Sequence, residues 1–157
     1  DLAGRRAGYV FRPINNWILN KIQVHRNKDA NADFYRKGRL AAIGMAGKIK
    51  AGEVVGLTGD QLLREGILVP FFGKETPTPQ AAAVMALKWS TPIYMVRIER
   101  FKGIRFKMTI EDKLKIPKTI DKEKATYEIT KLISSRIEEW IIDKPEQWLW
   151  AHRRWGK

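Results

Sequence analysis

The polar residues best placed to do chemistry are Asp60 and Gln61, which follow the short apolar segment of residues 54–57. In open α/β sheets, ligands bind beyond the carboxyl ends of the strands. An acid at such a position can orient a base, hold a cationic group or bind sugar hydroxyls. The alternative is a turn aspartate whose side chain bonds to its own backbone. Both interpretations stand on the sequence alone.

Arg12 and the Pro-Phe-Phe-Gly segment of residues 70–73 are further candidates. Arg12 ends the first apolar segment, where a guanidinium suits a phosphate or a carboxylate, although an isolated surface arginine is the commoner outcome. The neighbouring rings of residues 71 and 72 either line an acyl or sugar pocket or belong to an edge strand that buries one ring.

The C-terminal tail, residues 145–157, gathers three of the six tryptophans beside Arg153 and Arg154. Tryptophan offers a large apolar surface with one hydrogen-bond donor, and arginine is a planar cation that stacks on rings or forks onto anions. The tail therefore suggests an interfacial or anion-binding edge, and packing of the tryptophans against the sheet is the alternative.

The two histidines, His25 and His152, form no metal-binding pattern, and the chain has no cysteine. Disulfides, a thiol nucleophile and a cysteine-ligated metal are therefore excluded. No Walker loop, dinucleotide fingerprint or Gly-x-Ser-x-Gly motif occurs. We expect neither a metal nor an organic cofactor.

The apolar pattern predicts the elements that must position these residues. Strands are expected over residues 7–12, 54–57, 67–72, 92–98 and 104–110, the last two as a hairpin around Gly103. Helices are expected over residues 14–23, 40–49 and 79–89, with Thr78 as the N-cap of the third, and from the N-cap Asp121 to about residue 142. Residues 25–33 read as a polar connector, and a short helix should carry the tail.

This order favours a single α/β domain over residues 1–157, with a mixed, largely parallel central sheet flanked by helices. The length allows a real core. No apolar run reaches the roughly 18 residues of a membrane span.

The net charge of +13 is concentrated at the two ends of the chain. Residues 1–50 hold 11 Lys and Arg against 3 Asp and Glu, and residues 101–157 hold 14 against 9, whereas residues 51–100 balance at 5 against 5. A basic surface attracts nucleic acid, anionic lipid headgroups or an acidic protein. Because no zinc finger, RNP motif or KH-type loop occurs, we do not expect nucleic acid.

Several segments together resemble the bacterial lipid A biosynthesis acyltransferases, the lauroyl and myristoyl transferases of the lysophospholipid acyltransferase superfamily. The resemblance extends over almost the whole chain and is most specific in the Asp-Gln and Phe-Phe-Gly pair and in the tail. The matching segments, in order, are residues 11–16 (Phe-Arg-Pro-Ile-Asn-Asn), 51–61, 69–73, Thr78 before an alanine-rich helix, 91–97 and 145–155.

The resemblance implies an enzyme at the cytoplasmic face of the bacterial inner membrane, with a glycerol-phosphate-acyltransferase-like fold. It would move a fatty acyl group from acyl carrier protein to a hydroxyl of a lipid A precursor, in lipopolysaccharide biosynthesis. Acyl carrier protein, the phosphorylated precursor and the anionic membrane surface are the implied partners, and all three suit a basic chain.

In this superfamily a His-x4-Asp/Glu motif supplies the general base and the acid that orients it. The motif is expected upstream of residues 11–16, and His25 to Asp29 is no substitute because only three residues separate the two. The chain is thus expected to be the C-terminal, acceptor-site portion of such an enzyme, with no catalytic residue of its own and no activity alone.

The resemblance assigns acceptor-site roles by matching position. Arg12 would contact a phosphate or carboxylate of the acceptor. The remaining pocket residues would be Asp60, Gln61, Phe72, Gly73 and Thr78. The membrane or anion edge would be formed by Trp148, Arg153, Arg154 and Trp155.

Two other function classes are compatible with the residues. One is a non-catalytic module that binds anionic glycolipid or an acidic carrier protein. The other is a nucleic-acid-binding domain, which would show a steep dependence of affinity on salt.

Overall fold

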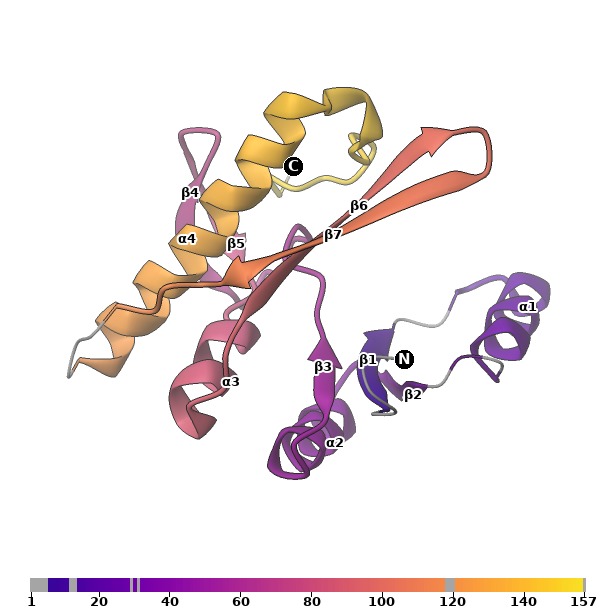
Figure 1. Cartoon of the computed structure of the whole chain (residues 1–157), viewed down its shortest axis with the longest axis horizontal. Helices are drawn as coiled ribbons and strands as arrows, with labels where there is room; N and C mark the ends of the chain where they lie inside the picture. Colours follow the sequence, from indigo (N-terminus) through magenta and orange to yellow (C-terminus); the bar gives the residue numbers. More distant parts are fainter. Residues whose placement is uncertain (1–5, 12–13, 29, 31, 118–120, 157) are drawn as a thin grey trace. The chain divides into compact units, whose positions relative to one another are not determined.

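The computed structural model describes residues 6–11, 14–28, 30, 32–117 and 121–156. It divides into two compact units, residues 1–57 and 58–157, shown in Figure 1. The protein is α/β, as predicted: parallel pairing occurs in the first unit, and antiparallel pairing occurs in the second. The single domain proposed over residues 1–157 stays a prediction.

The first unit is built on a three-stranded parallel sheet with strand order β2-β1-β3. Two helices make the crossover connections that parallel neighbours require. The elements in chain order are β1 (Ala7–Phe11), α1 (Trp17–Lys28), β2 (Ala32–Arg36), α2 (Arg39–Lys50) and β3 (Val54–Gly56).

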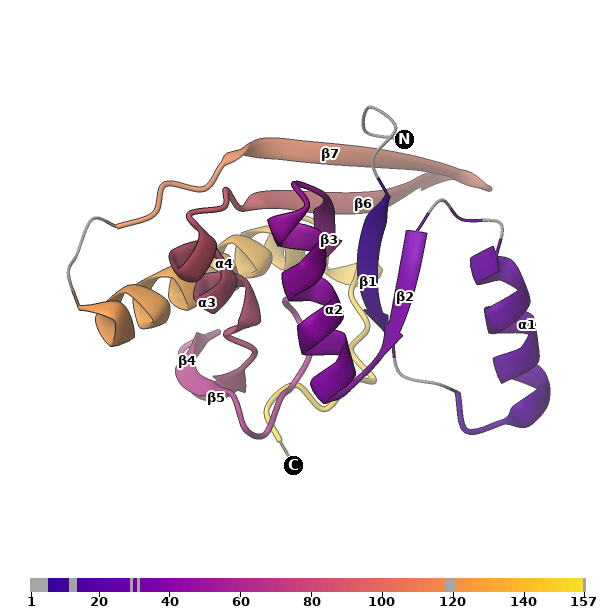
Figure 2. The ribbon, with the colours of Figure 1, turned by 90° about the horizontal axis from the view of Figure 1, so that it is seen from below.

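Helix α2 packs across all three strands (Figure 2). Gly44 allows this close approach, because a Cβ there would lie 2.3 Å from the ring of Tyr35. The ammonium of Lys48 is held between the carboxylates of Asp33 and Glu53, the latter at 2.5 Å. Hydrogen bonding in this cluster lowers the pKa of Asp33 and raises that of Lys48. The helix is thus tied electrostatically to β2.

Helix α1 is longer than the sequence pattern indicated. It begins after Asn16, whose Oδ1 accepts hydrogen bonds from the backbone N–H groups of residues 18 and 19 at 3.0 and 3.1 Å. It continues to Lys28, and β2 begins at Ala32, so the predicted polar connector over residues 25–33 is wrong. Arg26 and Lys28 lie in the last turn, where cations suit the carbonyl end of a helix.

Over its described residues, the second unit contains two antiparallel hairpins, two α-helices and the tail. The hairpin predicted around Gly103 is confirmed. The extended segment at residues 67–72 is also confirmed, but its partner β5 was not predicted. The elements are β4 (Ile67–Phe71), β5 (Lys74–Thr78), α3 (Ala81–Trp89), β6 (Tyr94–Lys102), β7 (Arg105–Lys113), α4 (Lys122–Asp143) and the 3₁₀ turn η1 (Pro145–Gln147).

Thr78 is the last residue of β5 and does not cap α3. The helix begins at Ala81 with Gln80 at the N-cap position, so the predicted cap is wrong. The physical reason is that the Thr78 hydroxyl donates to the Thr76 carbonyl, at 2.9 Å, within the strand.

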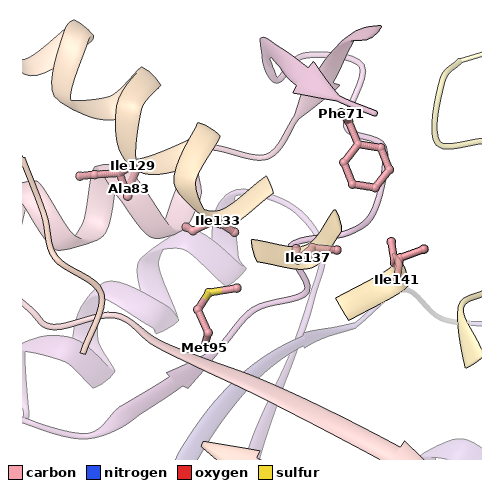
Figure 3. Packing of buried hydrophobic residues seen from close by; sticks show 7 residues of the cluster. All are labelled: Phe71, Ala83, Met95, Ile129, Ile133, Ile137 and Ile141. Atoms are coloured by element: carbon pink, nitrogen blue, oxygen red, sulfur yellow. The ribbon is translucent and has the colours of Figure 1, made fainter. Parts of the chain in front are cut away.

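Helix α4 carries the core of the second unit, and its predicted N-cap is confirmed. Asp121 accepts hydrogen bonds from the backbone N–H groups of Glu123 and Lys124 at 2.9 and 3.1 Å. Leu132 lies on the exposed side of this helix. Figure 3 shows the core cluster around the buried face of the helix, formed by Phe71, Ala83, Met95, Ile129, Ile133, Ile137 and Ile141.

The short helix expected in the tail is the 3₁₀ helix η1, and a series of turns follows it. Pro145 opens the turn, and the N–H of Trp148 donates to its carbonyl at 3.3 Å. The tail folds back onto the core, because Trp148 and Trp155 both pack against its cluster.

Candidate functional site

The loop that carries Asp60 and Gln61 is fastened by a histidine of the tail. The backbone N–H of Leu62 donates to Nε2 of His152 at 2.9 Å, across 90 residues of sequence. Because Nε2 is the acceptor, this bond requires the neutral imidazole with its proton on Nδ1. Asp60 is half-buried and Gln61 is exposed. The tail therefore fixes the backbone of the loop while these two side chains remain accessible.

Arg154 is the most deeply buried charged residue among those described, with an exposed fraction of 0%. Its guanidinium donates to the carbonyl of Pro77 at 2.9 Å and to the hydroxyl oxygen of Thr78 at 2.7 Å. Its central carbon lies 4.7 Å from the ring centroid of Phe71. Within the described residues no carboxylate reaches ion-pair distance of Arg154. The guanidinium is thus stabilised by two oxygens and one ring face.

Burial lowers the pKa of Arg154, and the charge of Asp60 acts in the opposite direction. Arg154 and Asp60, two of the predicted site residues, therefore interact electrostatically. Carboxylate oxygens accept hydrogen bonds from hydroxyl groups. The arrangement suits Asp60 to bind a hydroxyl-bearing ligand.

Phe72 and Gly73 form the two-residue turn that joins β4 to β5. Both have positive φ angles, 50° and 71°, and the register pairs Phe71 with Lys74 on either side. Left-handed residues at both central positions match the twist of a hairpin. A phenylalanine in this conformation costs on the order of 1 kcal/mol or more. The turn places the partly buried Phe72 ring against the core cluster.

The rings around this turn form an aromatic cluster. Phe71 and Phe72 pack edge to face at 5.0 Å between centroids. Trp148 and Trp155 lie 5.9 and 5.7 Å from Phe71, and the Trp155 indole N–H donates to the Phe71 carbonyl at 3.2 Å. An open groove of about 320 Å³ lies beside the cluster, lined by Phe72, Lys74, Trp150 and Trp155. Three rings and one ammonium suit a ligand with an apolar chain and an anionic group.

The remaining predicted residues are distributed as follows. Arg12 lies outside the described residues. Trp148 and Trp155 are half-buried in the aromatic cluster, whereas Arg153 is exposed. The tail therefore contributes one arginine to the interior and one to the surface, and the predicted membrane edge remains a hypothesis.

The structure brings Thr78 and Arg154 into direct contact and places Phe72 with Trp155 in one cluster. Three contributing residues were not assigned to the site from the sequence: His152, Lys74 and Trp150. His152 and Trp150 lie in the tail motif, between residues that the sequence did assign to the site, and this position could have indicated them. For Lys74 only the adjacent glycine turn could have indicated its position.

Over the described residues, no group of three or more His, Asp or Glu side chains is arranged to hold a metal ion. None of the helices in that part combines the length and apolar character needed to cross a bilayer.

Comparison with known proteins identifies relatives of the chain over nearly its whole length. Residues 3–157 match the family model described as bacterial lipid A biosynthesis acyltransferase. The lipid A biosynthesis palmitoleoyltransferase of Escherichia coli (strain K12) is 28% identical over 166 residues, covering 98% of this chain and 51% of that protein. A lipid A biosynthesis acyltransferase of Shigella flexneri matches with the same identity and coverage. The chain thus spans about half the length of the curated relatives it matches. These matches confirm the resemblance drawn from the sequence motifs: the chain belongs to the bacterial lipid A biosynthesis acyltransferase family.

Proposed function

We propose that this chain supplies the acceptor-site portion of an enzyme that transfers a fatty acyl group from acyl carrier protein to a hydroxyl of a lipid A precursor. The observation that carries the proposal is the family match over residues 3–157. The fastened loop of Asp60 and Gln61 supports it, because a half-buried carboxylate and an exposed amide on a fixed backbone suit a polyhydroxylated sugar.

The aromatic groove supports the same proposal for the apolar part of a substrate. Phe72, Trp150 and Trp155 offer ring surfaces to an acyl chain, and the Lys74 ammonium offers a charge to a phosphate or carboxylate. In this proposal the groove holds an acyl chain of the acceptor or the donor, and Asp60 and Gln61 hold the sugar.

The reacting proton is handled by groups outside these 157 residues, because no His-x4-Asp/Glu motif occurs in them. In the proposed reaction, the histidine of that motif takes the proton of the acceptor hydroxyl, and the oxygen attacks the thioester carbonyl of the donor. The tetrahedral intermediate then expels the carrier thiolate, which receives a proton. The residues of this chain bind and orient the acceptor, which is a contribution of proximity.

The charge of the chain supports the proposed partners and place. A chain with a net charge of +13 attracts an acidic carrier protein and a phosphorylated glycolipid. We place the protein at the cytoplasmic face of the inner membrane, where both substrates meet.

The test is acyl transfer by a longer protein that joins this chain to a segment containing the His-x4-Asp/Glu motif. Asp60→Ala should lower transfer by about 100-fold, the scale of a substrate misplaced by about 1 Å, with an unchanged circular dichroism spectrum. Glu65→Ala is the matched control, because Glu65 is an exposed acid five residues further along the chain. Full activity of the Asp60→Ala protein would refute the assignment of the acceptor loop.

The same experiment distinguishes the proposed enzyme from the alternative, a non-catalytic binding module. That alternative requires the longer protein to bind anionic glycolipid while transferring no acyl group from any carrier-bound donor tested.

A further inference from the structure

The turn of the β6–β7 hairpin is rich in both cations and large apolar residues. The hairpin tip, residues 100–107, reads Arg-Phe-Lys-Gly-Ile-Arg-Phe-Lys: four cations, three large apolar residues, one glycine and no acid. Ile104 is 93% exposed and Phe101 is 75% exposed. Large apolar side chains that are exposed together on a surface mark binding sites more often than single ones do.

The tip is supported by its contacts with the end of α4 and with the tail. The Arg97 guanidinium lies 2.7 Å from Asp143, and the Lys144 ammonium lies 2.5 Å from Glu99. These ion pairs hold β6 at residues 97 and 99, directly before the tip. Hydrogen bonding by Lys144 is the largest influence that lowers the pKa of Glu99, so the carboxylate is ionised at neutral pH.

Gln147 adds a two-point clamp at the base of the tip. Its Oε1 accepts from the backbone N–H of Arg100 at 2.8 Å, and its Nε2 donates to the Arg100 carbonyl at 3.1 Å. Beyond this clamp the hairpin extends past the C-terminal end of α4 (Figure 1). The side chains of the tip are thus presented on a supported, projecting turn.

The cations of the tip lie among its apolar groups. The Arg100 guanidinium lies over the Phe106 ring at 5.0 Å from its centroid and donates to the Gly103 carbonyl at 3.3 Å. Lys102 pairs with Arg105 across the turn. Cations interspersed with exposed apolar side chains suit a bilayer surface, in which headgroup phosphates lie outside acyl chains.

We propose that the hairpin tip docks on an anionic lipid bilayer, with Phe101 and Ile104 inserted among the acyl chains and the four cations at the headgroups. This surface is distinct from the groove and loop described above, and the proposal does not depend on acyl transfer. Nucleic acid would gain little from an exposed isoleucine, because its binding relies on phosphate contacts and stacking.

The first test measures binding of the chain to vesicles of phosphatidylglycerol and phosphatidylcholine by flotation, against pure phosphatidylcholine. Each cation near an anionic surface contributes about fivefold to affinity, so Lys102→Glu combined with Arg105→Glu should weaken binding by at least about 25-fold. Phe101→Ser combined with Ile104→Ser should weaken it by at least about tenfold, through the lost apolar insertion.

Two control variants match these changes elsewhere in the second unit. Lys122→Glu combined with Lys131→Glu makes the same change in net charge at two exposed positions of α4, and Ile142→Ser removes an exposed apolar side chain there. Both should retain binding within about threefold. A loss in the charge control as large as in the tip variant would overturn the proposal, because net charge alone would then explain binding. Retained binding by the Phe101 and Ile104 variant would overturn insertion.

A second measurement reads insertion without depending on affinity. Because the chain has no cysteine, Ile104→Cys carries a single environment-sensitive label, and Ser135→Cys on α4 carries the control label. Emission of the label at position 104 should shift to shorter wavelength with anionic vesicles and be quenched by lipids that carry a quencher in their acyl chains. If the protein floats with the vesicles but the emission of the label at position 104 does not shift, the proposal is contradicted.

Discussion

Replacement of Arg154 by alanine tests whether the tail is an integral part of the second unit. The guanidinium makes hydrogen bonds to Pro77 and Thr78 and lies over the Phe71 ring. Hydrogen bonds from a charged donor contribute about 1.5–3 kcal/mol each, and a desolvated cation over a ring about 2 kcal/mol. Burying the charge costs several kcal/mol, and this cost is recovered when the side chain is removed. The expected net loss in the free energy of unfolding is about 3 kcal/mol.

Urea unfolding followed by tryptophan fluorescence measures this loss, because five of the six tryptophans lie in residues 58–157. With an m value of about 1.5 kcal/mol per molar urea, the midpoint should fall by about 2 M at unchanged m. Arg153→Ala is the matched control, since the neighbouring arginine is exposed, and it should change stability by less than about 0.5 kcal/mol. Equal effects of the two substitutions, or a loss below about 0.5 kcal/mol for Arg154→Ala, would refute the reasoning.

Three further predictions follow from single contacts in the second unit. Ile129→Ala removes a fully buried core side chain and should lower the free energy of unfolding by about 2–5 kcal/mol in the same urea assay, whereas no change would contradict the assigned core. The bidentate contact of Arg136 lowers the pKa of Glu111. The stabilisation from this ion pair is therefore present above the unfolded-state pKa of about 4.3 and is lost as pH falls through the lower folded-state pKa. Arg136→Gln should reduce the free energy of unfolding at pH 7 more than at pH 2, as measured by urea midpoints. His152→Ala should accelerate hydrogen exchange of the Leu62 amide, and unchanged protection would show that the histidine does not fasten the loop.

The sequence predicted best those elements whose signals are local. Asp121 is followed by backbone N–H groups that its own side chain reaches, and the predicted N-cap is confirmed. The hairpin at Gly103 has alternating apolar residues on both sides of a glycine that adopts a positive φ of 57°. Such features depend on neighbours within a few residues, so they can be read from the chain.

The elements that were missed depend on contacts distant in sequence. Strand β5 contains Pro77 between two threonines and reads as a polar loop, but pairing with β4 and the Arg154 contact make it a strand. The Arg-Arg pair of the tail gives no local sign of which member is buried. The answer lies in partners 76 and 77 residues earlier in the chain, Thr78 and Pro77, which only the folded structure brings together.

For the candidate site too, the sequence indicated individual residues but not the distant contacts that surround them. The motif match placed Asp60 and Phe72 in a pocket region, and the structure gives each a distinct surrounding: a loop fastened by His152 and a turn beside an aromatic groove. The histidine was considered only as a metal ligand, because a hydrogen bond to a backbone N–H 90 residues away has no sequence signature.

The measurement that tests the central claim most directly is a nuclear magnetic resonance titration of the chain with a soluble, short-chain phosphorylated glucosamine disaccharide. The account predicts saturable shifts in the backbone amides of Asp60, Gln61 and Leu62 and in those of Phe72 and Gly73. Asp60→Ala should reduce the affinity at least about tenfold, the scale of one lost polar contact, and Glu65→Ala should leave it unchanged. Shifts confined to other parts of the chain, or equal affinities for the two variants, would contradict the assignment of this loop and turn as the acceptor site.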